Sequence, residues 1–392
     1  MRSLLWLAKR VIFDPFNRVQ KTWFIRLLFY SIDEFKDGCN IKEGLATLER
    51  KLVPKDQKVA VVTGSSTGIG FETCLLFARS GIRSYATMRD LMKADLIKDI
   101  AKKEKLPLKV IQMDVDKDDS VAEGFKQIRE DDEGGMSIDI LVNNAGFGLF
   151  GALEDQSIED IKKQFETNLF GAIRTIQQVL PIMRDQRSGT IVNISSLAGY
   201  VGFPASSVYN STKFALEGLS ESLAYEVEPY GVSIILIEPG VVNTNFVKNI
   251  IIPDNTQSIS SYLSSPSSSP SPSASLSMDA AAATTSSSST IGSAKYSENP
   301  KSNRETTHYS DVLERFLSHY YPAMRNAPEP KEVAKVILES IEASVVPAMQ
   351  GANNYNNFFR YPVGKDAKLY ADAKRKMSDS ELHSFVVKKV LS

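Results

Sequence analysis

The segment Y-N-S-T-K places a phenol, Tyr209, four residues before an amine, Lys213. Side chains four residues apart share one face of a helix, so a helix over this segment would bring the two groups together. A free phenol has a pKa of about 10, and a nearby cation lowers that pKa because it favours the phenolate. Ser196, thirteen residues before the tyrosine, adds a hydroxyl group. These residues predict a site that moves a proton at neutral pH.

A glycine-rich turn, T-G-S-S-T-G-I-G, covers residues 63–70 and follows the apolar segment 58–63. Gly64, Gly68 and Gly70 let the backbone approach a ligand closely, and the N–H groups that open the next helix attract phosphate. The spacing differs from the common G-x-G-x-x-G, and glycines in a turn are weak evidence by themselves. With the proton-transfer residues downstream, the turn predicts a dinucleotide site and a reaction that moves a hydride and a proton.

The end of the second predicted strand bears on the choice of cofactor. An acid about 20 residues past the glycines binds the ribose hydroxyls of NAD, whereas an arginine accommodates the 2′-phosphate of NADP. Met88 stands where the acid is expected, Arg89 follows it, and Ser66 offers a further hydroxyl. NADP(H) is therefore the predicted cofactor, with NAD(H) left open. The alternative is that Arg89 is a surface charge paired with Asp90.

Composition excludes several classes of protein. The chain has 392 residues, 42% of them hydrophobic and 24% charged, as in a globular protein with a substantial core. Its net charge of −1 argues against nucleic-acid binding. Cys39 and Cys74 are too few for a disulfide framework, which favours a reducing compartment and predicts a cytoplasmic location. His308, His319 and His383 lack metal-ligand spacing, so no metal site is expected.

From residue 58 onward, short apolar strands alternate with helices. This order predicts an α/β fold: a doubly wound, Rossmann-type parallel sheet in a single domain with helices on both faces. The predicted strands are residues 58–63, 84–88, 108–113, 138–142, 189–194, 232–237 and 358–363. The predicted helices are residues 71–80, 157–184, 208–228, 312–319 and 331–344, followed by a helical C-terminal tail.

Two segments differ from this pattern. Residues 1–56 interleave basic and aromatic side chains without an apolar run long enough to span a bilayer. They predict an N-terminal extension that makes peripheral contact with a membrane surface, packs on the main domain, or is a cleaved targeting peptide. Residues of about 255–303 are rich in Ser, and we expect a disordered insertion within a domain that covers residues 57–392.

Several motifs resemble the classical short-chain dehydrogenase/reductase family over residues 58–363, apart from the insertion. They are T-G-x-x-x-G-x-G, N-N-A-G at residues 143–146, Asn168 in the long helix, S-x12-Y-x-x-x-K, and P-G followed by Thr244. The resemblance implies that Tyr209 is the general acid in carbonyl reduction and the general base in alcohol oxidation. It implies that Lys213 lowers the phenol pKa and binds the nicotinamide ribose, that Ser196 orients the substrate oxygen, and that Asn168 holds a water that relays the proton.

The same resemblance implies which residues contact the cofactor. Asp114 and Val115 would contact the adenine, residues 143–146 would flank the nicotinamide ribose, Val242 would lie near the carboxamide, and Thr244 would close on the diphosphate. The full expected set is Thr63, Gly64, Ser66, Thr67, Gly68, Ile69, Gly70, Arg89, Asp114, Val115, Asn143, Ala145, Gly146, Tyr209, Lys213, Pro239, Gly240, Val242 and Thr244.

Apolar residues near the predicted carbonyl site indicate a hydrophobic small-molecule substrate. They are Phe147, Leu149, Phe150, Tyr200, Val201 and Phe203. The stretches Y-A-T-M-R-D and R-Y-P-V-G-K-D-A are similar to the branch that holds 17-beta-hydroxysteroid dehydrogenases and retinol dehydrogenases, which implies a lipid-, steroid- or retinoid-like carbonyl/alcohol pair. The resemblance also implies a homodimer. The alternative function is a non-catalytic NADP-binding scaffold or sensor on the same fold.

Overall fold

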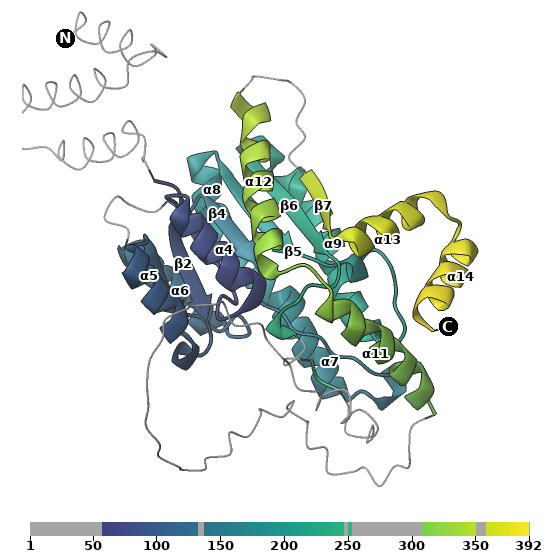
Figure 1. Ribbon diagram of the computed structural model, residues 1–392. Helices are drawn as coiled ribbons and strands as arrows, with labels where there is room; N and C mark the ends of the chain where they lie inside the picture. The colour runs from purple at the N-terminus through teal and green to yellow at the C-terminus, as the bar shows by residue number, and fades with distance from the viewer. Residues whose placement is uncertain (1–56, 132–136, 247–249, 253–307, 350–357, 392) are drawn as a thin grey trace, which may run out of the picture. The chain divides into compact units, whose positions relative to one another are not determined.

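A parallel β-sheet of seven strands lies at the centre, in the order β3-β2-β1-β4-β5-β6-β7 (Figure 1). The computed structural model describes residues 57–131, 137–246, 250–252, 308–349 and 358–391. The strand order reverses between β1 and β4, and ligands of such sheets bind where the strands end beside that reversal. The strands are β1 (Val59–Val62), β2 (Arg83–Met88), β3 (Leu108–Gln112), β4 (Ile140–Asn143), β5 (Gly189–Ile194), β6 (Val232–Pro239) and β7 (Phe358–Val363).

Helices cover both faces of the sheet because the side chains of each strand alternate between them. Ala60 and Val62 of β1 pack toward α4 (Gly68–Arg79), α5 (Asp95–Glu104) and α12 (Pro330–Met349). Val59 and Val61 pack on the opposite face, toward α6 (Asp118–Asp131), α8 (Gly171–Gln186) and α9 (Ser207–Val227). β1 is buried on both sides and is therefore continuously apolar.

The predicted helix over residues 157–184 is three segments in the structure. It begins as α7 (Ile158–Phe165), widens into a π-helix over Glu166–Phe170, and continues as α8. Such π segments are short and often occur at functional sites. This one contains Asn168, which the sequence had singled out.

A third hydrophobic cluster lies beyond the sheet and joins distant parts of the chain. It packs Phe150 against α11 (Ser310–Arg325) and α14 (Asp379–Val390), with α13 (Lys365–Lys376) contributing Ala373. Phe316 of α11 lies edge-on to Phe150, with ring centroids 5.2 Å apart. The C-terminal helices therefore form a wall beside the sheet edge where the strands end.

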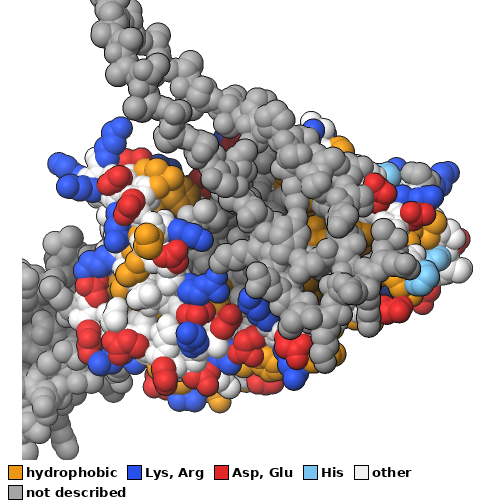
Figure 2. Space-filling model, turned by 90° about the horizontal axis from the view of Figure 1, so that it is seen from below, with side chains coloured by type: hydrophobic (Ala, Val, Ile, Leu, Met, Phe, Trp, Pro, Cys, Tyr) orange, Lys and Arg blue, Asp and Glu red, His pale blue; other side chains and the backbone are white. Residues whose placement is uncertain are grey.

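The predicted fold class, a doubly wound Rossmann-type parallel sheet, is confirmed. All seven predicted strands are present with ends shifted by at most a few residues, whereas α5 and α6 were not predicted. The N-terminal extension and the Ser-rich insertion lie outside the described residues. Within the described ranges, no helix is long and apolar enough to cross a membrane. The face drawn in Figure 2 intersperses basic and acidic side chains.

A chain of buried polar side chains ties two strands to two helices. Asn143 of β4 donates to Asn193 of β5 at 2.9 Å and accepts from the Thr175 hydroxyl of α8 at 2.6 Å. Asn193 in turn donates to Ser220 of α9 at 2.8 Å. All four side chains are buried. Each of these side chains has a hydrogen-bond partner, and buried polar groups that are paired in this way do not destabilise a core.

Replacing Asn193 by Ala should lower the free energy of unfolding by about 2–4 kcal/mol, because the amide of Asn143 and the hydroxyl of Ser220 both lose a buried partner. Chemical denaturation measures the loss. Thr190→Val is the matched control: Thr190 is buried on the same strand, and its hydroxyl bonds to no described side chain. If Asn193→Ala loses no more free energy of unfolding than Thr190→Val, these buried hydrogen bonds contribute little to stability.

Candidate active site

Three of the four predicted catalytic side chains line one cavity of about 350 Å³. Tyr209 and Lys213 come from the first turns of α9, and Ser196 follows β5. Ser196 begins the short helix Leu197–Gly199, and its hydroxyl accepts from the N–H of Ala198 at 3.1 Å. The cavity lies where β4, β5 and β6 end, as expected for a doubly wound sheet.

The buried position of Tyr209 and Lys213 controls how they titrate. Burial raises the pKa of Tyr209 to about 12, and a hydrogen bond with Ser196 acts in the opposite direction. Burial also lowers the pKa of Lys213 to about 8, opposed by the charge of Glu217. Loss of hydration is thus the main influence on the phenol. The expectation that Lys213 lowers the pKa of Tyr209 stays a prediction.

The Lys213 side chain is held by the backbone. Its Nζ donates to the Ile194 carbonyl at 2.8 Å and lies 5.8 Å from the centroid of the Tyr209 ring. An ammonium has three donors, so one bond to β5 leaves others directed to the cavity. Lys213 is thus fixed at the end of the strand while its remaining donors can meet a ligand.

The neighbouring Ser195 also lines the cavity. Its side chain is buried, and its hydroxyl has no hydrogen-bond partner with acceptable geometry among the described residues. Ser196 remains the predicted catalytic serine because it is the one that stands thirteen residues before Tyr209.

Asn168, the fourth predicted catalytic residue, is not among the residues that line the cavity. Its side-chain oxygen accepts from the Phe147 N–H at 3.0 Å, and its Nδ2 donates to the Phe147 carbonyl at 3.0 Å and to Thr212 at 3.1 Å. The side chain therefore fixes the loop after β4 to α9. The predicted relay water is not tested by these contacts.

The glycine turn fits a phosphate-binding site. Gly64 and Gly68 have φ of +66° and +65°, a conformation that L side chains rarely adopt. A Cβ on Gly64 would lie 2.8 Å from the Cα of Ala145, and one on Gly70 would lie 2.4 Å from the Asn144 amide. Thr67 caps α4 without a side-chain hydrogen bond, and no acidic residue lies in the first turn. The N–H groups of α4 are thus left to an anion.

Thr63 and Asn144 hold this turn against the loop after β4. The Thr63 hydroxyl accepts from the N–H groups of Asn144 and Ala145, both at 3.0 Å. The Asn144 amide donates to the carbonyls of Thr63 and Gly64 at 2.9 and 3.1 Å. Asn144 also lines the cavity, and it belongs to the N-N-A-G stretch that was expected to flank the nicotinamide ribose. Asn143, which is in that set, points into the buried polar chain instead.

The predicted adenine-end residues lie apart from this cavity, at the ends of β2 and β3. Arg89 is exposed and forms no ion pair with any described residue, while Asp90 accepts from the N–H of Met92 at 3.0 Å. The alternative that Arg89 pairs with Asp90 is therefore not observed. Asp114 is partly exposed, whereas Val115 is buried.

The segment after β6 brings Pro239, Gly240, Val242 and Thr244 to the cavity, as predicted. Thr244 also approaches the glycine turn, since a Cβ on Gly68 would lie 3.5 Å from its side chain. Asp366, at the start of α13, accepts from the Val241 N–H at 2.7 Å and lines the same cavity. Asp366 was not predicted as a site residue, although it stands in the R-Y-P-V-G-K-D-A stretch.

The cavity wall is largely aromatic. Of the expected apolar set, Phe147, Phe150 and Phe203 line it, whereas Leu149, Tyr200 and Val201 do not. Other lining residues come from distant segments that the sequence could not connect to the site: Phe246, Phe316, His319, Tyr320, Tyr370, Lys389 and Val390. Phe150 lies edge-on to the Tyr209 ring, with centroids 5.9 Å apart. The site therefore joins a proton-transfer pair to a wall suited to an apolar ligand.

Comparisons with known proteins agree with this arrangement. The family model described as short chain dehydrogenase matches residues 58–254. The chain is 30% identical over 316 residues to an uncharacterized oxidoreductase, YusZ, of Bacillus subtilis, covering 80% of this chain and 91% of that protein. It is 42% identical over 194 residues to human retinol dehydrogenase 8, covering 48% and 60% of the two chains. It is 36% identical over 202 residues to mouse 17-beta-hydroxysteroid dehydrogenase type 1, covering 50% and 57%.

The predicted branch is confirmed by the last two relatives. The order of the sheet, the glycine turn and the family match lead to one conclusion: the chain belongs to the short-chain dehydrogenase family of oxidoreductases.

Proposed function

We propose that the protein is an NADP(H)-dependent oxidoreductase that interconverts a hydrophobic ketone or aldehyde and its alcohol, with Tyr209 as the general acid and base. The observation that supports this most is the convergence of Ser196, Tyr209 and Lys213 on one cavity with an aromatic wall. Similarity to proteins named for retinol and hydroxysteroid oxidation supports a lipid-like substrate.

The residues fit a dinucleotide. The glycine turn has no room for a Cβ at Gly64 or Gly70, and the first N–H groups of α4 have no side-chain cap. The bound cofactor supplies or accepts the hydride. Residues of the P-G segment and the N-A-G loop enter the cavity next to Tyr209, as a nicotinamide site requires.

The buried Tyr209 phenol suits the role of a general acid. Burial raises its pKa to about 12, so the neutral phenol carries the proton that the substrate oxygen receives when a carbonyl is reduced. Ser196 donates a hydrogen bond to the same substrate oxygen, and the Lys213 ammonium stabilises the phenolate that remains. Alcohol oxidation uses the same groups in the opposite order.

We also propose the expected homodimer. The helices of one face expose Phe170, Phe214 and Tyr225, and pairing through α8 and α9 would cover such apolar surface. The cytoplasmic location and the membrane contact of the N-terminal extension stay predictions.

Tyr209→Phe should lower kcat by at least about a hundredfold, because it removes the proton donor and leaves the ring in place. The measurement is NADPH oxidation, followed by absorbance, over steroid, retinoid and acyl-ketone substrates. NADPH affinity, measured by fluorescence titration, should stay close to that of the wild type. The control is Tyr225→Phe, an exposed tyrosine on the same helix. Equal turnover in Tyr209→Phe and the wild type would refute the catalytic assignment and favour the binding-only alternative.

Arg89→Asp should lower the preference for NADPH over NADH by about tenfold or more, because a carboxylate repels the 2′-phosphate that a guanidinium would bind. The quantity to compare is the ratio of kcat/KM for the two cofactors. Lys93→Asp makes the same charge change at an exposed position nearby and should leave the ratio close to that of the wild type. An unchanged ratio in Arg89→Asp would show that Arg89 does not recognise the phosphate.

A further inference from the structure

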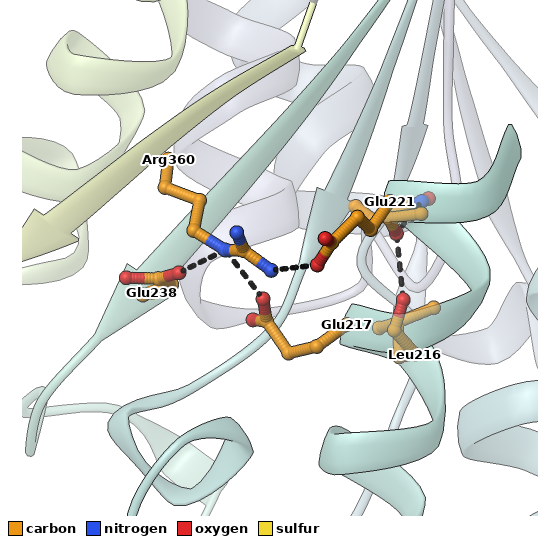
Figure 3. A network of polar contacts seen from close by, with 7 residues as sticks. Leu216, Glu217, Glu221, Glu238 and Arg360 are labelled. Carbon is orange, nitrogen blue, oxygen red and sulfur yellow. Dashed lines mark hydrogen bonds and ion pairs between the residues drawn. The ribbon is translucent and has the colours of Figure 1, made fainter. Parts of the chain in front are cut away.

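A network of one arginine and three carboxylates lies between α9 and strands β6 and β7 (Figure 3). Arg360 of β7 reaches Glu217 of α9 at 3.1 Å through Nε and Glu221 of α9 at 3.1 Å through Nη2. Its Nε also lies 3.4 Å from Glu238 of β6. Arg360 is further held over the Phe358 ring, 4.7 Å from its centroid. The guanidinium thus joins α9 to the edge of the sheet.

The three carboxylates differ in their environments. Glu217 and Glu238 are buried, whereas the Glu221 side chain is about half exposed. Burial and the charge of Glu217 raise the pKa of Glu238 to about 8. Burial raises the pKa of Glu217 as well, while Arg360 and the charge of Lys213 act in the opposite direction. Arg360 therefore counteracts the effect of burial on the Glu217 carboxylate.

Glu217 stands one helical turn after Lys213 on α9, so the two side chains share a face of the helix. One carboxylate oxygen of Glu217 bonds Arg360. The other, Oε1, is buried without a hydrogen bond of acceptable geometry among the described residues. Glu217 Oε1 lies near the hydroxyl of Ser195, the residue that follows β5. Both atoms are close to Gly199, because a Cβ placed on that glycine would be 2.6 Å from Ser195 Oγ and 3.1 Å from Glu217 Oε1. The buried Glu217 carboxylate therefore lies next to Ser195, which lines the cavity.

We propose that Glu217 is a positioning residue that keeps Lys213 charged as an ammonium, and that Arg360 holds the Glu217 carboxylate in place for this role. The inference deepens the proposed function, since it concerns the lysine of the same site. Glu217 is not among the residues that line the cavity, so it acts through Lys213 rather than on substrate. An ammonium in a dry cavity needs such a counter-charge, because burial favours the neutral amine.

Other charged groups around Glu217 support this assignment. Glu221 of α9, which is about half exposed, and Glu238 of β6, which is buried, lie on opposite sides of the Arg360 guanidinium (Figure 3). Burial raises the pKa of Tyr200, and the charges of Glu238, Asp366 and Glu217 add to this effect, with Arg375 of α13 opposing them. Of these acidic groups, Glu217 is the one whose charge is felt by Lys213.

Glu217→Gln should lower the titration midpoint of Lys213 by about one pH unit, because an opposite charge near an ammonium stabilises it by that order. The midpoint is measured by NMR on full-length protein carrying lysine labelled with carbon-13 at Cε, with the Lys213 resonance assigned from Lys213→Arg. In turnover assays the alkaline limb of kcat/KM should move to lower pH by the same amount, while activity on the acid side changes little.

Glu221→Gln is the matched control, because it removes the other α9 partner of Arg360 at an exposed position and should leave the Lys213 midpoint in place. Glu217→Asp keeps the negative charge, so its Lys213 midpoint should stay close to that of the wild type. If Glu217→Gln does not fold, Arg360→Gln makes the same test, since loss of the guanidinium lets the buried Glu217 take up a proton. A Lys213 midpoint that is the same in the folded variant and the wild type overturns the proposal.

The titration needs no turnover, so it separates this inference from the proposed function. If the Lys213 midpoint shifts in Glu217→Gln while Tyr209→Phe turns over as fast as the wild type, the catalytic assignment of Tyr209 is refuted and the role of Glu217 stands. If the Lys213 midpoint does not shift while Tyr209→Phe loses turnover, the catalytic assignment stands and the role of Glu217 is refuted.

Discussion

The site depends on a close approach between two backbone segments at the reversal of strand order. The turn after β1 packs on the loop after β4 so tightly that a Cβ at Gly64 would lie 2.8 Å from the Cα of Ala145. Thr63 and Asn144 hold the two segments together through backbone groups of both. This contact leaves the N–H groups of α4 uncapped at the sheet edge. Thr63 was expected to contact the cofactor, and in the structure its side chain holds the shape of the turn.

The second constraint is the loss of hydration at Tyr209 and Lys213. Burial opposes the charged form of both side chains. A neutral phenol beside an ammonium is the arrangement that suits protonation of a developing alkoxide. The same low-dielectric surroundings that make the charges costly make their interaction with a ligand stronger. The aromatic wall that includes Phe150 and Tyr320 thus contributes to the low-dielectric surroundings of Tyr209.

Local patterns predicted the parts of the structure that depend on local physics. Apolar strands such as β1, the glycine turn and the i, i+4 pair of Tyr209 and Lys213 are short-range features, and each was placed correctly. The helix α6 was missed although Val121, Phe125 and Ile128 form a buried stripe on it at helical spacing. The burial of Tyr209 could not be predicted from local pattern because it depends on segments far along the chain, such as α11, which packs on Phe150 beside it.

The same limit explains why the side-chain partners of Asn143 and the surroundings of Glu217 could not be predicted. Asn143 stands in a family motif, yet its amide turns toward Thr175 and Asn193, which only the packed helices can reveal. Glu217 looks like an ordinary polar residue of an amphipathic helix until β7 brings Arg360 to it from 143 positions away. A buried carboxylate with no such partner would be protonated. In the role proposed for Glu217, the charge on Lys213 therefore depends on the last strand of the sheet, which supplies Arg360.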